Sequence, residues 1–186
     1  MVTCGNNLED QYLFDRNILT SHVKDVDIPD GYKLRPLHLD DYKKGYLGLL
    51  EQLTTVGDVS EREWIKRFNS MKSKGCDEKQ SYYIIVLEEV ETEKIVASGT
   101  LVIEFKFIHH TGSRGRTEDI VTDKDYRGRR FSNIINKILV SLAKECGVYK
   151  LSLECKDSLI GFYEKFGYKK DQGNNFLVQR FDRSKL

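Results

Sequence analysis

Apolar positions recur with a helical period in four segments of the chain. In residues 38–53, five of them share one face at three-and-four spacing: Tyr42, Tyr46, Leu49, Leu50 and Leu53. A second helix is expected from Ser60, because Glu63 follows three residues later as in a capping box, to Gly75. The other helical patterns cover residues 131–146 and a segment that Asp157 is expected to cap and Gly167 to end.

The remaining apolar segments predict β-strands. Residues 81–87 and 95–107 are rich in β-branched and aromatic side chains and flank a polar turn, so we expect a hairpin. Further strands are expected at 32–35, at 116–122 after a turn at 112–115, at 149–155 and at 174–181. This order of elements predicts an α+β protein, with a mixed, mainly antiparallel sheet flanked by helices.

The first 30 residues differ from the rest of the chain. They are polar, lack sustained periodicity and close with the boundary signals Pro29 and Gly31. They predict an N-terminal extension (1–30) that is partly ordered at best, followed by one domain over residues 31–186.

Composition and charge exclude several classes of function. With 30 Lys and Arg against 29 Asp and Glu, the net charge of +1 gives no overall reason to bind nucleic acid. No apolar run approaches the roughly 18 residues that span a bilayer, so no integral membrane contact is expected. The N-terminus lacks a signal-peptide core, which predicts a cytoplasmic location. The four cysteines and four histidines lack zinc-ligand spacing, so no metal is expected.

The segment from residue 118 to residue 132 carries the clearest chemical signal. A strand is followed by a basic loop (Arg127, Gly128, Arg129, Arg130) and by the start of a helix. Unpaired backbone N–H groups and the helix dipole make such a start a site for phosphate or pyrophosphate. A solvated turn with scattered arginines, or a nucleic-acid patch, fits the loop alone equally well. Four acidic residues just upstream disfavour nucleic acid: Glu118, Asp119, Asp123 and Asp125.

Five further stretches make the interpretation more specific. They are Leu53-Thr-Thr-Val-Gly57, Ile103-Glu-Phe-Lys-Phe-Ile-His109, Gly115-Arg-Thr-Glu-Asp-Ile-Val121, Tyr149-Lys-Leu-Ser-Leu-Glu-Cys155 and Phe162-Tyr-Glu-Lys-Phe-Gly-Tyr168. With the loop Arg127-Gly-Arg-Arg-Phe-Ser132, they resemble the GNAT superfamily of acetyl-CoA-dependent N-acetyltransferases. The resemblance is closest to the glucosamine 6-phosphate N-acetyltransferase family. It covers residues 32–182 and implies the GNAT acyl-CoA N-acyltransferase fold.

This resemblance implies a reaction. The 2-amine of D-glucosamine 6-phosphate would attack acetyl-CoA directly, through a tetrahedral intermediate, to give N-acetyl-D-glucosamine 6-phosphate for UDP-N-acetylglucosamine biosynthesis. The implied catalytic residues are Tyr163, Glu154 and Val121. Backbone N–H groups near Ile120 and Val121 would polarise the thioester carbonyl, and the Tyr163 hydroxyl would stabilise or protonate the departing thiolate.

The resemblance also assigns the binding residues. Those for acetyl-CoA are Ile120, Val121, Thr122, Gly128, Arg129, Arg130, Phe131, Ser132, Asn133, Glu154 and Tyr163. Those for the sugar phosphate are Thr54, Lys106, Phe107, Ile108, His109, Glu118, Asp119, Ile120, Tyr149, Lys150 and Arg180. The family builds its sugar-phosphate site where two subunits meet, so a homodimer is expected, with residues 176–181 as a strand surface to share.

Some alternatives remain open at the level of the sequence. Arg130 and Ser132 stand where the superfamily often has glycine, which allows a CoA-binding pseudoenzyme. A GNAT enzyme that acetylates a polyamine or a protein lysine is the other alternative. The pair His109 and His110 receives little weight as a general base, because a sugar amine already has an appreciable free-base population near neutral pH. Cys155 receives little weight as a covalent acetyl carrier, because direct transfer suffices.

Overall fold

The computed structural model describes residues 11–24, 26–72 and 80–181. It divides into two compact units, Met1–Leu153 and Glu154–Leu186. The predicted end of the second helix at Gly75 lies outside the described residues. Among the described helices, none is long and apolar enough to cross a membrane.

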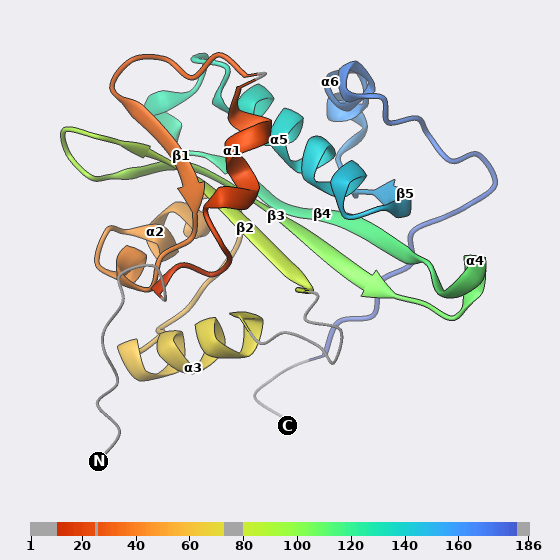
Figure 1. Cartoon of the computed structure of the whole chain (residues 1–186), viewed down its shortest axis with the longest axis horizontal. Coiled ribbons are helices and arrows are strands. Elements are labelled where there is room, and N and C mark those ends of the chain that lie inside the picture. Colours follow the sequence, from red (N-terminus) through yellow and green to blue (C-terminus); the bar gives the residue numbers. More distant parts are fainter. Residues whose placement is uncertain (1–10, 25, 73–79, 182–186) are drawn as a thin grey trace. The chain divides into compact units, whose positions relative to one another are not determined.

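A five-stranded sheet forms the centre of the first unit (Figure 1). Its strands follow chain order: β1 (Tyr32–Pro36), β2 (Tyr82–Glu89), β3 (Ile95–Phe105), β4 (Ser113–Thr122) and β5 (Val148–Ser152). The first four pair antiparallel, and β5 pairs parallel to β4. The mixed, mainly antiparallel sheet predicted from the sequence is therefore confirmed.

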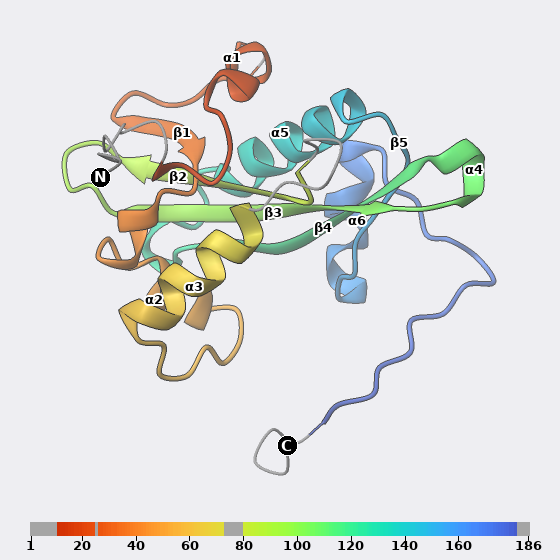
Figure 2. The same ribbon diagram turned by 60° about the horizontal axis from the view of Figure 1, so that its bottom comes forward.

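Helices cover both faces of this sheet (Figure 2). On one face lie α1 (Asn17–Val23) and α5 (Phe131–Glu145), and on the other lie α2 (Tyr46–Glu51) and α3 (Glu61–Lys72). The predicted apolar stripe of α5 is buried: Ile134, Ile135, Ile138, Leu139 and Leu142. The predicted capping box also forms, since the Ser60 N–H donates to Glu63 Oε2 at 2.9 Å and the Glu63 N–H donates to Ser60 Oγ at 3.3 Å.

Residues before Gly31 contribute to the core of the first unit. Leu13 is fully buried, Leu19 on α1 is 3% exposed, and the Leu13 N–H donates to the Leu37 carbonyl at 2.8 Å. Residues 11–24, which we expected to belong to a partly ordered extension, are thus anchored by apolar burial. The domain boundary near residue 31 stays a prediction.

The segment 38–53 does not form the single helix predicted from its spacing. A 3₁₀ turn, η2 (Leu39–Tyr42), comes first, and α2 begins only after Gly45, whose φ of +81° interrupts helical geometry. Leu53 lies beyond the end of α2 and is 48% exposed. The turn predicted at 112–115 was also misplaced: β4 starts at Ser113, and the chain reverses through α4 (Ile108–Thr111).

The second unit is mostly irregular. The predicted final helix consists of three short pieces, η4 (Asp157–Leu159), α6 (Ile160–Tyr163) and η5 (Glu164–Phe166), which end at Gly167 with φ of +88°. Asp157 does not cap them, because the N-cap position is Lys156 and no side chain caps it in the described structure. The predicted strand at 174–181 was wrong: these described residues form no strand, and Leu177 is 89% exposed.

Gly99 on β3 permits a close approach between sheet and helix. A Cβ atom at this position would lie 2.5 Å from Ile135 Cγ2 and 2.9 Å from Leu139 Cδ1, both on α5. Contacts this short force neighbouring atoms to move, so only glycine fits without rearrangement.

Gly99→Ala should therefore lower the free energy of unfolding by about 1–3 kcal/mol, the usual cost of overpacking a core. Gly48→Ala is the matched control, because Gly48 lies within α2 and a Cβ there meets no atom within 4 Å. The control should raise stability by up to about 1 kcal/mol through helix propensity. Urea unfolding of both variants measures this, and equal stability of the two would contradict the assigned packing.

Candidate active site

A β-bulge interrupts the pairing of β3 with β4. Ser98 is opposite Val121 and Thr100 is opposite Glu118, so Asp119 and Ile120 together face Gly99 alone. Asp119 takes a left-handed backbone conformation with φ of +51°. A bulge leaves a residue unpaired in the ladder and re-aims its neighbours. Backbone groups at this point of β4 are therefore available to a ligand, where the sequence predicted the thioester carbonyl.

Buried polar groups support the strand opposite the bulge. Ser98 is fully buried, its hydroxyl donates to the Ile85 carbonyl at 3.1 Å, and it also hydrogen-bonds Tyr46 of α2. Burial, together with the nearby charge of Asp119, keeps the pKa of Tyr46 above its ordinary value. Burial also raises the pKa of Asp119, although the residue as a whole is exposed. The bulge thus places the carboxyl-bearing residue Asp119 at the point where the ladder is interrupted.

The N-terminus of α5 is open in the way that an anion site requires. Gly128 has φ of +83°, and Arg130 occupies the N-cap with φ of +64° and without a side-chain capping bond among the described residues. The N–H groups of Asn133 and Ile134 donate to the Arg130 carbonyl. The first two N–H groups of the helix have no intrahelical acceptor and add to the positive end of its dipole.

Side chains around this loop fall into two groups. Phe131 is 1% exposed and packs on Tyr32, so only its backbone can meet a ligand. Thr122 and Ser132 join the end of β4 to the start of α5 through their hydroxyl oxygens, 2.9 Å apart. Arg129 donates to the Tyr32 hydroxyl at 2.7 Å and lies over the Tyr126 ring.

Gln52, which was not predicted from the sequence, connects the end of α2 to the segment just after β4. It is the C-cap residue of α2, two residues before Thr54, and its side chain contacts Asp123 and Lys124 just after β4. Burial alone would raise the pKa of Asp123, but hydrogen bonds from the Asp125 N–H, Lys94 and Gln52 hold it below its usual range. A single glutamine at a helix end carries no sequence signal that predicts this contact.

The connection between β3 and β4 holds another group of predicted residues. His109, His110 and Thr111 all have φ between 52° and 56°, an unusual run of left-handed residues without glycine. The His109 ring lies 4.1 Å from the Tyr149 ring, so the structure brings these two predicted sugar-phosphate residues together. Phe107 is 96% exposed and Ile108 is 61% exposed, while Lys106 pairs with Glu104 at 2.6 Å.

The predicted residues of the first unit thus form two clusters. The cofactor cluster comprises Ile120, Val121, Thr122 and residues 128–133, with Glu118 and Asp119 adjacent; the hairpin cluster comprises residues 106–109 with Tyr149 and Lys150. Six strand steps separate Ser113 from Asp119, or roughly 20 Å. The two clusters therefore lie toward opposite ends of β4.

In the second unit, Tyr163 lies on α6 among the rings of Phe162 and Tyr168. Burial raises its pKa, and the charge of Cys155 adds to the effect, so the phenol stays protonated near neutral pH. Burial and the charge of Asp157 likewise raise the pKa of the Cys155 thiol, which disfavours a covalent acetyl carrier. Glu154 and Arg180 are exposed residues of this unit.

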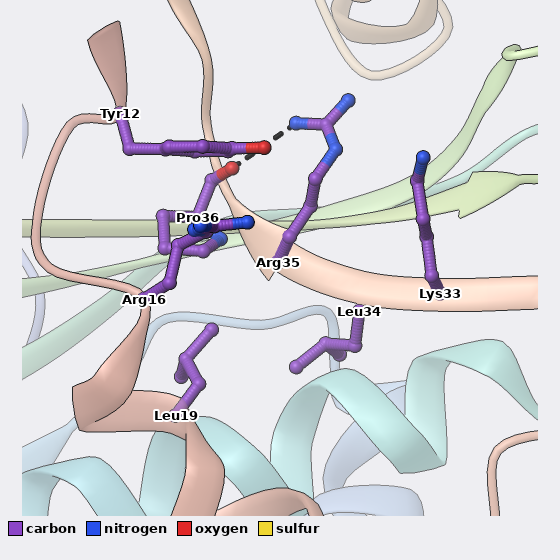
Figure 3. Close-up of a pocket in the computed structure, with 7 residues that line it drawn as sticks. All are labelled: Tyr12, Arg16, Leu19, Lys33, Leu34, Arg35 and Pro36. Carbon is purple, nitrogen blue, oxygen red and sulfur yellow. Dashed lines mark hydrogen bonds between the residues drawn. The ribbon is translucent and has the colours of Figure 1, made fainter. Parts of the chain in front are cut away.

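A separate cavity of about 240 Å³ lies beside β1 (Figure 3). Its lining consists of Tyr12, Arg16, Leu19, Lys33, Leu34, Arg35 and Pro36, none of them a predicted site residue. All three guanidinium nitrogens of Arg35 are engaged, by Glu88, by Asp41 and by the Pro36 carbonyl. Burial would raise the pKa of Glu88, but Lys33 and Arg35 hold it below its usual range. Arg35, Asp41 and Glu88 thus form a buried ion-pair network that stabilises the fold.

Comparison with known proteins places this geometry in a family. Residues 41–168 match the Acetyltransferase (GNAT) family. A probable glucosamine 6-phosphate N-acetyltransferase of Drosophila melanogaster is 44% identical over 151 residues, which are 81% of this chain and 67% of that protein. The glucosamine 6-phosphate N-acetyltransferase of Arabidopsis thaliana is 38% identical over 73% of this chain and 89% of its own length.

The fold agrees with these sequence relationships. The crystal structure of glucosamine-6-phosphate N-acetyltransferase from Arabidopsis thaliana superposes with a TM-score of 0.74 at 33% identity, over 81% of this chain and 99% of that one. The bulged strand, the open helix start and the sequence relatives thus lead to one assignment. The chain belongs to the GNAT acetyltransferase family and, within it, to the glucosamine 6-phosphate N-acetyltransferases.

Proposed function

We propose that this protein transfers the acetyl group of acetyl-CoA to the 2-amine of D-glucosamine 6-phosphate. The observation that carries the proposal is the bulge of β4 beside the open N-terminus of α5, in a chain whose relatives are named for this reaction. A GNAT-fold structure from Clostridium acetobutylicum, described with acetyl-CoA, shares the fold with a TM-score of 0.58 at 18% identity.

Different parts of the first unit are suited to bind different parts of acetyl-CoA. The free N–H groups at the start of α5 and the arginines of the loop suit the pyrophosphate. Thr122 and Ser132 hold the loop against the end of β4, which sets the distance from pyrophosphate to thioester. Backbone groups freed at Asp119 and Ile120 would then stabilise the oxyanion that forms on the thioester carbonyl.

The acceptor needs different groups. Asp119, whose carboxyl lies at the bulge, is suited to bind the amine or a neighbouring hydroxyl of the sugar close to the reacting carbon. Glu118 and Thr54 are the other proposed contacts to the sugar. Lys150 and Arg180 supply cations for its phosphate. Tyr163, which keeps its proton at neutral pH, would stabilise the thiolate as it leaves, with Glu154 nearby in sequence.

A homodimer is part of the same proposal. The hairpin cluster lies roughly 20 Å along β4 from the bulge, so it suits the site of a second protomer better than that of its own. Exposed apolar side chains at the hairpin end, Phe107 and Ile108, suit burial in such an interface. Within the same proposal, the enzyme is cytoplasmic and its product feeds UDP-N-acetylglucosamine biosynthesis.

A thiol-release assay tests the reaction. Acetyl-CoA is supplied with glucosamine 6-phosphate, with glucosamine, or with a lysine peptide, and only the first should give fast release because it alone offers the phosphate. Thiol release with the peptide alone would refute the proposal. Absence of thiol release with every amine, together with measurable CoA binding, would instead favour the pseudoenzyme.

Tyr163→Phe tests the leaving-group role in the same assay. The interaction strengthens as charge builds on sulfur, so kcat should fall about 10- to 1,000-fold while the KM values change little. Tyr168→Phe is the neighbouring control and should retain the wild-type rate. If kcat of Tyr163→Phe is unchanged while chemistry limits turnover, the tyrosine only packs.

A matched pair at Arg130 separates charge from backbone strain. Arg130→Gly and Arg130→Ala both remove the cation, so both should weaken CoA binding about two- to five-fold. Only glycine is unstrained at φ of +64°, so the glycine variant should be more stable than the alanine variant by about 1 kcal/mol. Calorimetry and urea unfolding measure the two effects. Equal stability of the pair would refute the strain, and unchanged CoA affinity would refute the role of the charge.

Mixing two inactive variants tests whether two protomers build one site. Asp119→Ala damages the bulge and His109→Ala damages the hairpin end, so each homodimer should be slow. Co-expression should restore about a quarter of the wild-type rate, because half of the dimers then carry one intact site of two. No recovery, in a mixture that light scattering shows to be dimeric, would place both residues in the site of one chain.

A further inference from the structure

We propose that Gln52 is a positioning residue that couples binding of the acetyl acceptor to binding of CoA. The inference deepens the proposed function and rests on it, because it takes residues 128–133 as the CoA phosphate site and Thr54 as an acceptor contact. What carries it is a pair of hydrogen bonds that join these regions across 71 and 72 residues of sequence.

Both polar atoms of the Gln52 amide are used. Its Nε2 donates to Asp123 Oδ2 at 3.2 Å, and its Oε1 accepts from the Lys124 N–H at 2.8 Å. A carboxylate accepts and an N–H donates, so only one orientation of the amide satisfies both partners. Gln52 therefore acts through its neighbours and not as a group that contacts the reacting atoms.

One end of this connection is rigid. Asp123 is 4% exposed, its N–H donates to the Val96 carbonyl at 2.9 Å, and its Oδ1 accepts from the Asp125 N–H at 2.9 Å. Lys94 Nζ lies 3.0 Å from the same Oδ2 that Gln52 contacts. Asp123 also begins the short segment, η3 (Lys124–Tyr126), that leads into Arg127 and Gly128. A ligand that fixes the phosphate loop would restrain η3, and with it the Lys124 N–H from which Gln52 accepts.

The other end is the start of the loop over residues 53–59. Gln52 ends α2, and the Thr54 N–H donates to the Leu50 carbonyl at 3.1 Å in the turn that follows. The far end of the loop is held where the Tyr42 hydroxyl donates to the Val59 carbonyl at 3.0 Å. Thr54 lies on the Gln52 side, so the amide sets how this residue is presented relative to the bulge.

These contacts give a physical route for coupling. Ordering a loop costs conformational entropy, and a second ligand that meets an already ordered loop loses less. When CoA holds the phosphate loop, the Gln52 amide holds the base of the 53–59 loop in the orientation that the acceptor needs. By linkage, the acceptor must improve CoA binding by the same factor.

Calorimetry with CoA, in the absence and presence of saturating N-acetylglucosamine 6-phosphate, tests the proposal. In the wild-type protein the sugar phosphate should tighten CoA binding about five-fold or more. Gln52→Met keeps the length of the side chain and removes both hydrogen bonds, so the ratio of the two dissociation constants should fall to about one. Binding of CoA alone should change less than about three-fold, because the α5 N-terminus is untouched.

The control is Glu51→Gln, an exposed neighbour on α2 that should keep the wild-type ratio. If Gln52→Met does not fold, Gln52→Glu replaces it. That variant retains the bond from the Lys124 N–H but places a second carboxylate against Asp123, so its ratio should also fall.

Each outcome is decisive. A Gln52→Met protein that melts earlier but keeps the wild-type ratio has lost only a structural contact, and this overturns the inference. A wild-type ratio of one also overturns it, even if the thiol-release assay shows that the proposed function stands. Absence of thiol release with glucosamine 6-phosphate defeats the proposed function, and the coupling inference with it.

Discussion

The close approach of α5 to β3 at Gly99 is the constraint on which the candidate site depends. The helix can approach this closely only because no Cβ atom intervenes between the strand and Ile135. At the same level, β4 carries two residues opposite Gly99 and bends away from regular pairing. The end of β4, the basic loop and the first turn of α5 follow directly from this arrangement. The tight packing at Gly99 and the interrupted pairing at Asp119 and Ile120 therefore occur at the same level of the sheet.

Among the described residues, backbone strain is concentrated at three places: the bulge, the start of α5 and the hairpin end. Described non-glycine residues with positive φ include Asp119 at the bulge, Arg130 at the helix start, and His109, His110 and Thr111 at the hairpin end. Each such residue costs about 1–2 kcal/mol relative to relaxed backbone. The buried apolar side chains of α5 and of the central strands must offset this cost. Strain of this kind persists where the surroundings over-determine the backbone, as they do beside the rigid sheet.

Elements with strong local signals could be predicted from the sequence, and elements set by tertiary contacts could not. The capping box at Ser60, the α5 stripe and the β2–β3 hairpin depend on spacing within one segment, and all three form. The bulge requires the facing strand, and the hydrogen bond of Gln52 requires a partner 71 residues away. Residues 174–181 have the composition of a strand but no hydrogen-bonded neighbour strand in the described structure. Composition alone does not supply a partner.

The position of α1 affects how the chain reaches this fold. His22 on α1 lies 2.7 Å from Ser141 and 2.8 Å from Glu145, both on α5, so an early segment of the chain packs on a much later one. Contacts so distant in sequence raise the contact order, which slows folding. During synthesis, residues 11–24 leave the ribosome before α5 has been made. Until then, their apolar side chains are exposed to solvent or make non-native contacts. The first unit can therefore complete its packing only after α5 has been synthesised.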